Sequence, residues 1–174
     1  AYEMQRGMGA VFGLNAGWEH PLWFADAPGT EDTNGFARQN WFEPVGREAA
    51  MLRDAVGVID ISNFGKYEVT GPGAGDWLDA LVANHVPREI GKSCLTPLIG
   101  MRGGVAGDFT ITMTGDESYM MIGSGMAERY HRRFFDMVPL PDGTGFEVAT
   151  PRIAGFNVAG PLSRKMLAGL TDTD

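Results

Sequence analysis

One short pattern occurs twice in this sequence, 89 residues apart (158 − 69), and it constrains the fold more than any other feature. Residues 67–81 read YEVTGPGAGDWLDAL, and residues 156–170 read FNVAGPLSRKMLAGL. Each copy has a short run of strand-forming residues, then Gly-Pro, and then apolar residues at helical spacing. Each copy therefore predicts a strand, a tight turn and an amphipathic helix. A repeated unit of this kind indicates a duplicated α+β domain whose halves pack together.

The other predicted elements follow from apolar spacing and turn residues. Helical spacing predicts a helix over residues 44–56. Strict alternation of polar and apolar residues predicts a strand over 108–114, and a returning strand is expected over 119–122. Ser124 is expected to cap a further helix. Shorter strands are expected over residues 58–60, 64–69 and 94–100. The expected fold class is α+β, with antiparallel sheets and packed helices.

The repeat also predicts how the chain is organised. We expect residues 1–43 to be an N-terminal extension or connector, residues 44–148 to be the first α+β half, and residues 149–174 to begin the second half. The second copy of the pattern is followed by only a few residues, whereas the first copy is followed by several further elements. We therefore expect the sequence to be part of a longer protein, with its second half truncated.

Charge and composition exclude several classes of function. The net charge of −8 argues against nucleic acid as a partner. No apolar run approaches the roughly 20 residues of a membrane span, and the first residues do not resemble a signal peptide. The expected location is cytoplasmic, without a membrane partner. Cys94 is the one cysteine, and no two of the three histidines have metal-ligand spacing, so no metal site is expected.

Asp108 is the candidate catalytic residue. It stands in the stretch RGGVAGDFT, after a glycine-rich turn and at the start of a strand. Phe109 and Ile111 should point to the core and Asp108 to the opposite, polar face. There its carboxylate could accept a hydrogen bond from a flat ligand that approaches the glycine turn. The alternative is a turn residue whose carboxylate bonds its own loop amides, and the spacing alone favours this alternative.

Two segments carry a resemblance to a known family. The segment VGVIDISNFGKYEVTGPGAGDWLDALVANHVP contains Asp60, Ser62 and Lys66 as Asp-x-Ser-x-x-x-Lys, and TPLIGMRGGVAGDFTIT follows it. Both resemble the folate-binding aminomethyltransferase family, whose type member is the glycine cleavage T-protein, over residues 44–174. The segment GAVFGLNAGWEHPLWFA, with NWFEPVG further on, resembles the region that joins the flavin part to the folate part in dimethylglycine and sarcosine dehydrogenases. The run MMIGSG also looks like that branch.

The resemblance implies a duplicated folate-binding domain that uses tetrahydrofolate for one-carbon (aminomethyl or methylene) transfer. It implies that Asp108 lies beside the reduced pterin and raises the nucleophilicity of its N5. The positions that would contact folate are Phe64, Leu95, Thr110, Thr112, Ile122 and Ser124. Leu95 and Thr112 stand where glycine cleavage proteins have aromatic residues, and Ser124 stands where they have asparagine. These departures suit the dehydrogenase branch.

The resemblance also implies partners and leaves alternatives open. The expected partners are a small-molecule folate and a methylamine donor, with FAD only if a dehydrogenase domain precedes this chain in a longer protein. Further folate contacts are expected beyond Asp174, so the chain alone should bind folate weakly and be inactive. One alternative is a folate-binding regulatory module without catalysis. Another is a folate-dependent demethylase with a different methyl donor.

Overall fold

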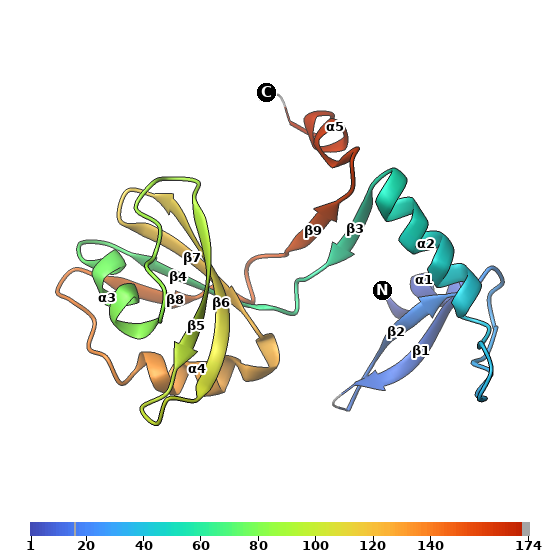
Figure 1. Cartoon of the computed structure of the whole chain (residues 1–174), viewed down its shortest axis with the longest axis horizontal. Helices are drawn as coiled ribbons and strands as arrows, with labels where there is room; N and C mark the ends of the chain where they lie inside the picture. The colour runs from blue at the N-terminus through green and yellow to red at the C-terminus, as the bar shows by residue number, and fades with distance from the viewer. Residues whose placement is uncertain (16, 172–174) are drawn as a thin grey trace. The chain divides into compact units, whose positions relative to one another are not determined.

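The structure, a computed structural model, describes residues 1–15 and 17–171 (Figure 1). The chain divides into two compact units. The terminal unit combines residues 1–58 with 158–174, and the central unit comprises residues 59–157. Within the described residues, none of the helices is long and apolar enough to cross a membrane.

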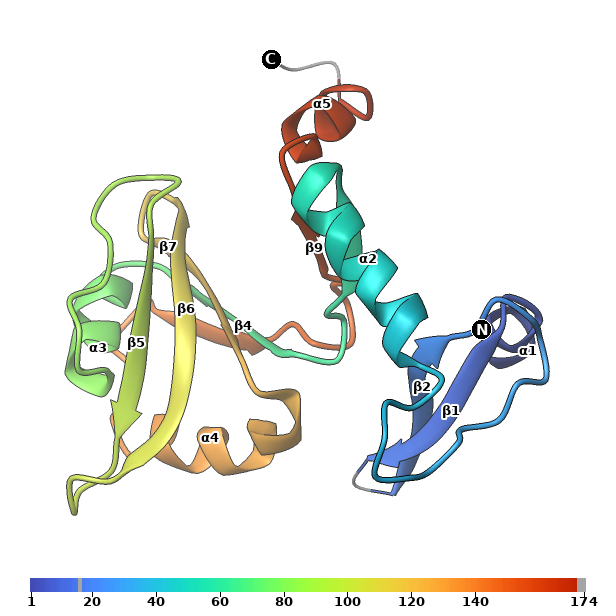
Figure 2. The same ribbon diagram turned by 45° about the vertical axis from the view of Figure 1, so that its right-hand side comes forward.

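The central unit is built on a five-stranded antiparallel sheet (Figures 1 and 2). The strand order is β5-β6-β7-β4-β8. The strands are β4 (Gly65–Thr70), β5 (Ser93–Ile99), β6 (Val105–Gly115), β7 (Ser118–Gly123) and β8 (Gly145–Val148). The predicted strands 64–69, 94–100, 108–114 and 119–122 are therefore all present, and the antiparallel α+β fold class is confirmed.

Two helices contribute apolar side chains to the core on one face of this sheet. Helix α3 (Ala74–Leu81) supplies Trp77 and Leu78, and α4 (Glu128–Phe135) supplies Phe135. These side chains pack with fully buried Tyr67 and Phe109 from the sheet. Burial of apolar surface at this core is the main stabilising contribution to the unit.

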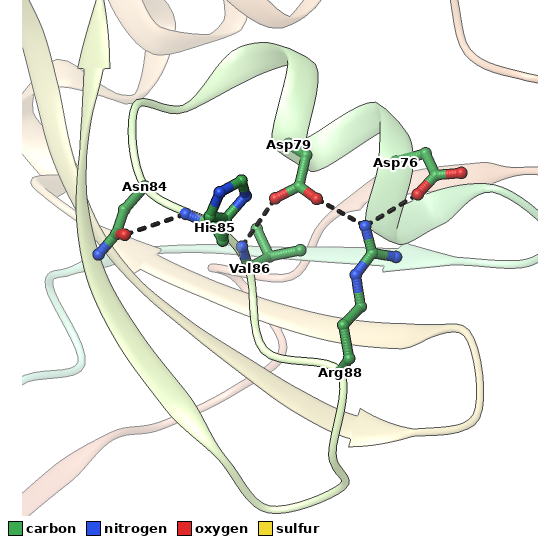
Figure 3. Close-up of polar contacts among 6 residues, drawn as sticks. All are labelled: Asp76, Asp79, Asn84, His85, Val86 and Arg88. Atoms are coloured by element: carbon green, nitrogen blue, oxygen red, sulfur yellow. Dashed lines mark hydrogen bonds and ion pairs between the residues drawn. The ribbon is translucent and has the colours of Figure 1, made fainter.

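The segment that leads from α3 to β5 is fixed by polar contacts (Figure 3). The Asp79 carboxylate accepts hydrogen bonds from the Val86 N–H at 2.7 Å and from the Arg88 guanidinium at 2.6 Å. Arg88 also donates to Asp76 at 2.8 Å. These bonds raise the pKa of Arg88, with Asp79 as the larger cause. Partly exposed ion pairs of this kind each contribute at most about 1 kcal/mol, so they order the segment more than they stabilise the fold.

The terminal unit contains regular structure that the sequence analysis did not predict. Helix α1 (Tyr2–Gly7) precedes an antiparallel hairpin of β1 (Ala10–Asn15) and β2 (Trp18–Phe24). The Trp23 side chain is buried, and its indole N–H donates to Asp32 Oδ1 at 2.7 Å. Trp18, in contrast, is 80% exposed. The unit also includes two predicted helices: α2 (Phe42–Asp54), expected over residues 44–56, and α5 (Ser163–Ala168), expected from the second copy of the pattern.

The two copies of the repeated pattern form the same local structure. The first is β4, a turn and α3, and the second is β9 (Phe156–Ala159), a turn and α5; β9 pairs with β3 (Gly57–Asp60). The turn glycines Gly71 and Gly160 have φ of 105° and 118°. A Cβ on either would lie 2.3 or 2.4 Å from a main-chain oxygen, so both positions require glycine. The predicted part boundaries at residues 43 and 148 stay a prediction.

The predicted helix cap at Ser124 is wrong. Ser124 precedes a short 3₁₀ helix (Gly125–Ala127), its side chain makes no capping hydrogen bond, and α4 begins only at Glu128. Gly125 packs closely against the turn before β4, because a Cβ there would lie 1.8 Å from the Asn63 carbonyl oxygen. Among residues 1–15 and 17–171, the Ser124 hydroxyl has no hydrogen-bond partner.

Candidate functional site

The register of the sheet brings the predicted site residues together on the face opposite the core. Leu95 of β5 lies opposite Thr110 of β6, and Thr110 lies opposite Ile122 of β7. Directly opposed residues in an antiparallel sheet place their side chains on the same face. Asp108 is two residues from Thr110 on β6, so it shares this face. Its neighbour Phe109 is fully buried on the other face, as predicted.

These residues border a hollow of about 260 Å³, here called the Asp108 hollow. It contains the Asp108 side chain and five of the six predicted folate contacts. Its lining is made of Asn63, Phe64, Leu95, Asp108, Thr110, Ile122, Gly123, Ser124, Gly125 and Met126. The walls combine an aromatic ring and aliphatic side chains with one carboxylate and two hydroxyl groups, which suits a flat, polar-edged molecule.

The Asp108 carboxylate is exposed and lies inside strand β6, three residues after the strand begins at Val105. Among the residues that the structure describes, no hydrogen bond or ion pair reaches this carboxylate. The alternative interpretation, in which Asp108 bonds the amides of its own turn, is therefore contradicted. The carboxylate is free to accept a hydrogen bond from a molecule in the hollow.

Two sequence expectations about the surroundings of Asp108 differ from the structure. Thr112 does not line the Asp108 hollow; it lies further along β6, where its hydroxyl is 2.7 Å from Ser93 Oγ. The glycine turn is also elsewhere, because Gly100 and Gly104 border a separate hollow of about 310 Å³. The glycines that line the Asp108 hollow are Gly123 and Gly125.

Four lining residues were not identified from the sequence. Asn63 directly precedes Phe64 in the turn before β4, and Met126 follows Gly125. A Cβ on Gly123 would lie 2.6 Å from the Phe109 ring. The Gly-Ser-Gly run around Ser124 was the available signal, since glycines on both sides of a hydroxyl residue indicate close packing of the main chain.

A buried histidine packs against the core side of β6. His131 is 1% exposed, its Nδ1 lies 3.3 Å from the Tyr67 hydroxyl, and its ring lies 4.7 Å from the Phe109 ring. Burial lowers the pKa of His131, although the Asp108 and Glu128 carboxylates act in the opposite direction. The neutral form of the imidazole is thus favoured in the folded chain.

This burial predicts a pH dependence of stability. Because the pKa of His131 is lower in the folded chain, the unfolded chain takes up the proton first as the pH falls through about 6.5. The free energy of unfolding should therefore decrease below that pH, by at most about 1.4 kcal/mol per pH unit.

Urea unfolding between pH 7.5 and 5.5 measures this decrease. His131→Gln should reduce it, whereas His85→Gln, at an exposed position, should leave it unchanged. An equal decrease in both variants would rule out His131 as its source.

The comparisons with known proteins decide the family. A family model described as the GCVT N-terminal domain matches residues 1–174. The chain belongs to the GCVT N-terminal domain family. Mouse (Mus musculus) mitochondrial dimethylglycine dehydrogenase is 34% identical over 166 residues, which are 93% of this chain and 19% of that protein.

Two further relatives extend the GCVT resemblance. The 4-methylaminobutanoate oxidase (formaldehyde-forming) of Paenarthrobacter nicotinovorans is 28% identical over 96% of this chain and 20% of that protein. The crystal structure of glycine cleavage system aminomethyltransferase T from Bartonella henselae has the same fold, with a TM-score of 0.73 and 22% identity over 97% of this chain and 42% of that one. The chain thus spans about a fifth of the length of the mouse dehydrogenase and of the oxidase.

Among residues 1–15 and 17–171, no three His, Cys, Asp or Glu side chains are grouped so that they could hold a metal ion. Cys94 is half-buried, and burial raises the pKa of its thiol, so a reactive thiolate is disfavoured. In the Asp108 hollow, apolar walls and free polar groups converge.

Proposed function

We propose that this chain is the first part of a tetrahydrofolate-dependent one-carbon transfer domain in a protein like the dimethylglycine dehydrogenases. Asp108 is its catalytic carboxylate. The observation that carries the proposal is the free, exposed Asp108 carboxylate beside a hollow in a member of the GCVT family. The donor would be a small N-methylamine, in keeping with the names of the two larger relatives.

The hollow fits the ring of a reduced folate better than the whole molecule. Pockets that enclose a complete ligand usually measure about 300–1,000 Å³, whereas this one measures about 260 Å³. Phe64, Leu95 and Ile122 offer surfaces for the faces of a flat ring. Within the described residues, the hydroxyl groups of Thr110 and Ser124 have no hydrogen-bond partner, so both are available to its polar edge.

When bound, a reduced folate supplies a nucleophilic nitrogen that captures a one-carbon unit. The protein has to hold that ring in one orientation and manage one proton. Asp108 accepts a hydrogen bond from a ring N–H and can take up the proton; a positioned base of this kind contributes about 10²–10⁴-fold. Phe64 and Ile122 would hold the ring in one orientation, and Leu95 and Met126 would help to exclude water from it.

The proposal also covers the partners of the chain and its location in the cell. The partners are the folate, the methylamine donor and, in a longer protein, an FAD-containing dehydrogenase domain outside this chain. The cytoplasmic location stays a proposal, and the mouse relative named above is mitochondrial. A regulatory module that binds folate without catalysis, or a demethylase with another methyl donor, would use the same hollow but differ in its need for Asp108.

Titration calorimetry with tetrahydrofolate tests the proposal. The longer protein that contains this chain should bind tetrahydrofolate, whereas the 174-residue chain alone should bind weakly or not at all, because its hollow encloses only a ring. Folic acid, with its oxidised ring, is the matched control ligand. Absence of binding by the longer protein would contradict the folate proposal. Tight binding by the chain alone would contradict the expectation that further folate contacts lie beyond Asp174.

A further inference from the structure

A buried ammonium group lies behind one wall of the Asp108 hollow. Lys66 of β4 is 2% exposed. Its Nζ donates to the Ser62 carbonyl at 3.0 Å and to the Phe64 carbonyl at 2.9 Å. In the described part of the chain, no carboxylate forms an ion pair with this Nζ. Buried charges are normally paired because desolvation is costly, so a lysine kept here needs a reason.

The two carbonyl groups belong to the turn that carries the wall. The Phe64 N–H donates to the Ile61 carbonyl at 3.0 Å, which closes a turn over residues 61–64. Lys66 Nζ binds two further carbonyl groups of the same segment. Because Asn63 and Phe64 line the hollow, this turn sets where the Phe64 ring lies.

The lysine itself is rigidly held. Its main-chain N–H donates to Thr150 Oγ1 at 2.9 Å, and its carbonyl accepts from the Ala149 N–H at 2.8 Å. The side chain is covered by Gly155, where a Cβ would lie 3.3 Å from Lys66 Cε. The Gly155 N–H also donates to Ser62 Oγ at 3.1 Å. The ammonium group is therefore held in place, and its hydrogen bonds anchor the turn over residues 61–64.

The geometry points to Lys66 as a positioning residue for the Asp108 hollow. Its ammonium holds the Ser62 and Phe64 carbonyl groups and so fixes the Phe64 ring at the wall of the hollow. A charge-assisted hydrogen bond to each carbonyl is stronger than a neutral one. This strength accounts for a lysine at a position where an apolar side chain would avoid the cost of desolvating a charge. The consequence for a ligand rests on the proposed function, whereas the ordering of the turn does not.

Amide hydrogen exchange of the 174-residue chain tests the ordering directly. Lys66→Met keeps most of the stem but removes the donors, so the Phe64 and Gly155 amides should exchange at least about 10-fold faster. Amides of β6 and β7 should be unchanged. Lys66→Gln keeps a donor and should restore part of the protection, and Lys92→Met, at an exposed lysine, is the matched control.

Unchanged exchange at Phe64 would overturn the inference. Equal acceleration throughout the central unit would also overturn it, because that pattern describes a residue needed only for stability.

A double-mutant cycle in the longer protein tests the consequence for ligand binding. Lys66→Met should weaken tetrahydrofolate binding by about 10-fold, and adding it to Phe64→Ala should cause little further loss, because Lys66 acts through Phe64. Additive losses would contradict this route. If the unmodified protein does not bind tetrahydrofolate, the proposed function fails, while the exchange measurement still decides the role of Lys66.

Discussion

Replacing Asp108 with asparagine is expected to lower one-carbon transfer by the longer protein at least about a hundredfold. Asparagine has nearly the same shape but cannot take up a proton at neutral pH. The carboxylate is exposed and, within the described residues, makes no hydrogen bond. The free energy of unfolding should therefore stay within about 0.5 kcal/mol of the unmodified protein.

Single-turnover transfer from the methylamine donor to tetrahydrofolate measures this effect, together with the dissociation constant of tetrahydrofolate. Asp116→Asn is the control, because Asp116 is an exposed carboxylate in the turn between β6 and β7. Unchanged transfer with intact folate binding would favour the regulatory module over the enzyme. A large loss of stability would instead show that Asp108 has a structural role.

The adjacent residue should behave in the opposite way. Phe109 is fully buried, and its ring packs against Tyr67, His131 and Phe135 with centroid distances of 6.1, 4.7 and 5.7 Å. Phe109→Ala removes these contacts and leaves a cavity at the centre of the core. The expected loss is about 3–5 kcal/mol in the free energy of unfolding, which is a large share of the stability of a domain of this size.

Urea unfolding followed by far-ultraviolet circular dichroism measures this loss on the 174-residue chain. Met101→Ala is the control, because the Met101 side chain is 89% exposed and its removal should change stability by no more than about 0.5 kcal/mol. A loss below about 1.5 kcal/mol for Phe109→Ala would show that the core relaxes around the site. Together, Asp108→Asn and Phe109→Ala separate the role of the exposed face of β6 from that of its buried face.

The strand pattern was predictable, and the assembly of the site was only partly so. Alternation along residues 108–114 placed Asp108 and Phe109 on opposite faces, because side-chain direction in a strand depends on local geometry alone. The resemblance supplied Leu95 and Ile122 as candidates. That they meet beside Thr110 depends on the register of β5, β6 and β7, which no local pattern encodes.

The glycine turn was expected beside Asp108 because the two are close in sequence, but closeness in sequence does not place residues in the same site. Gly104 precedes Asp108 by only four residues, but an extended strand covers about 13 Å over that distance. The turn therefore borders a different hollow. The hairpin of β1 and β2 was missed for another reason: a bulge between Val11 and Phe12 shifts the alternation, and Pro21 lies inside β2.

All ten residues that line the Asp108 hollow fall between positions 63 and 126, within one compact unit. The site proposed for the folate ring would thus be encoded by one contiguous segment of the sequence. Substitutions before position 63 or after position 126 can therefore change the rest of the chain without replacing any residue that lines the hollow.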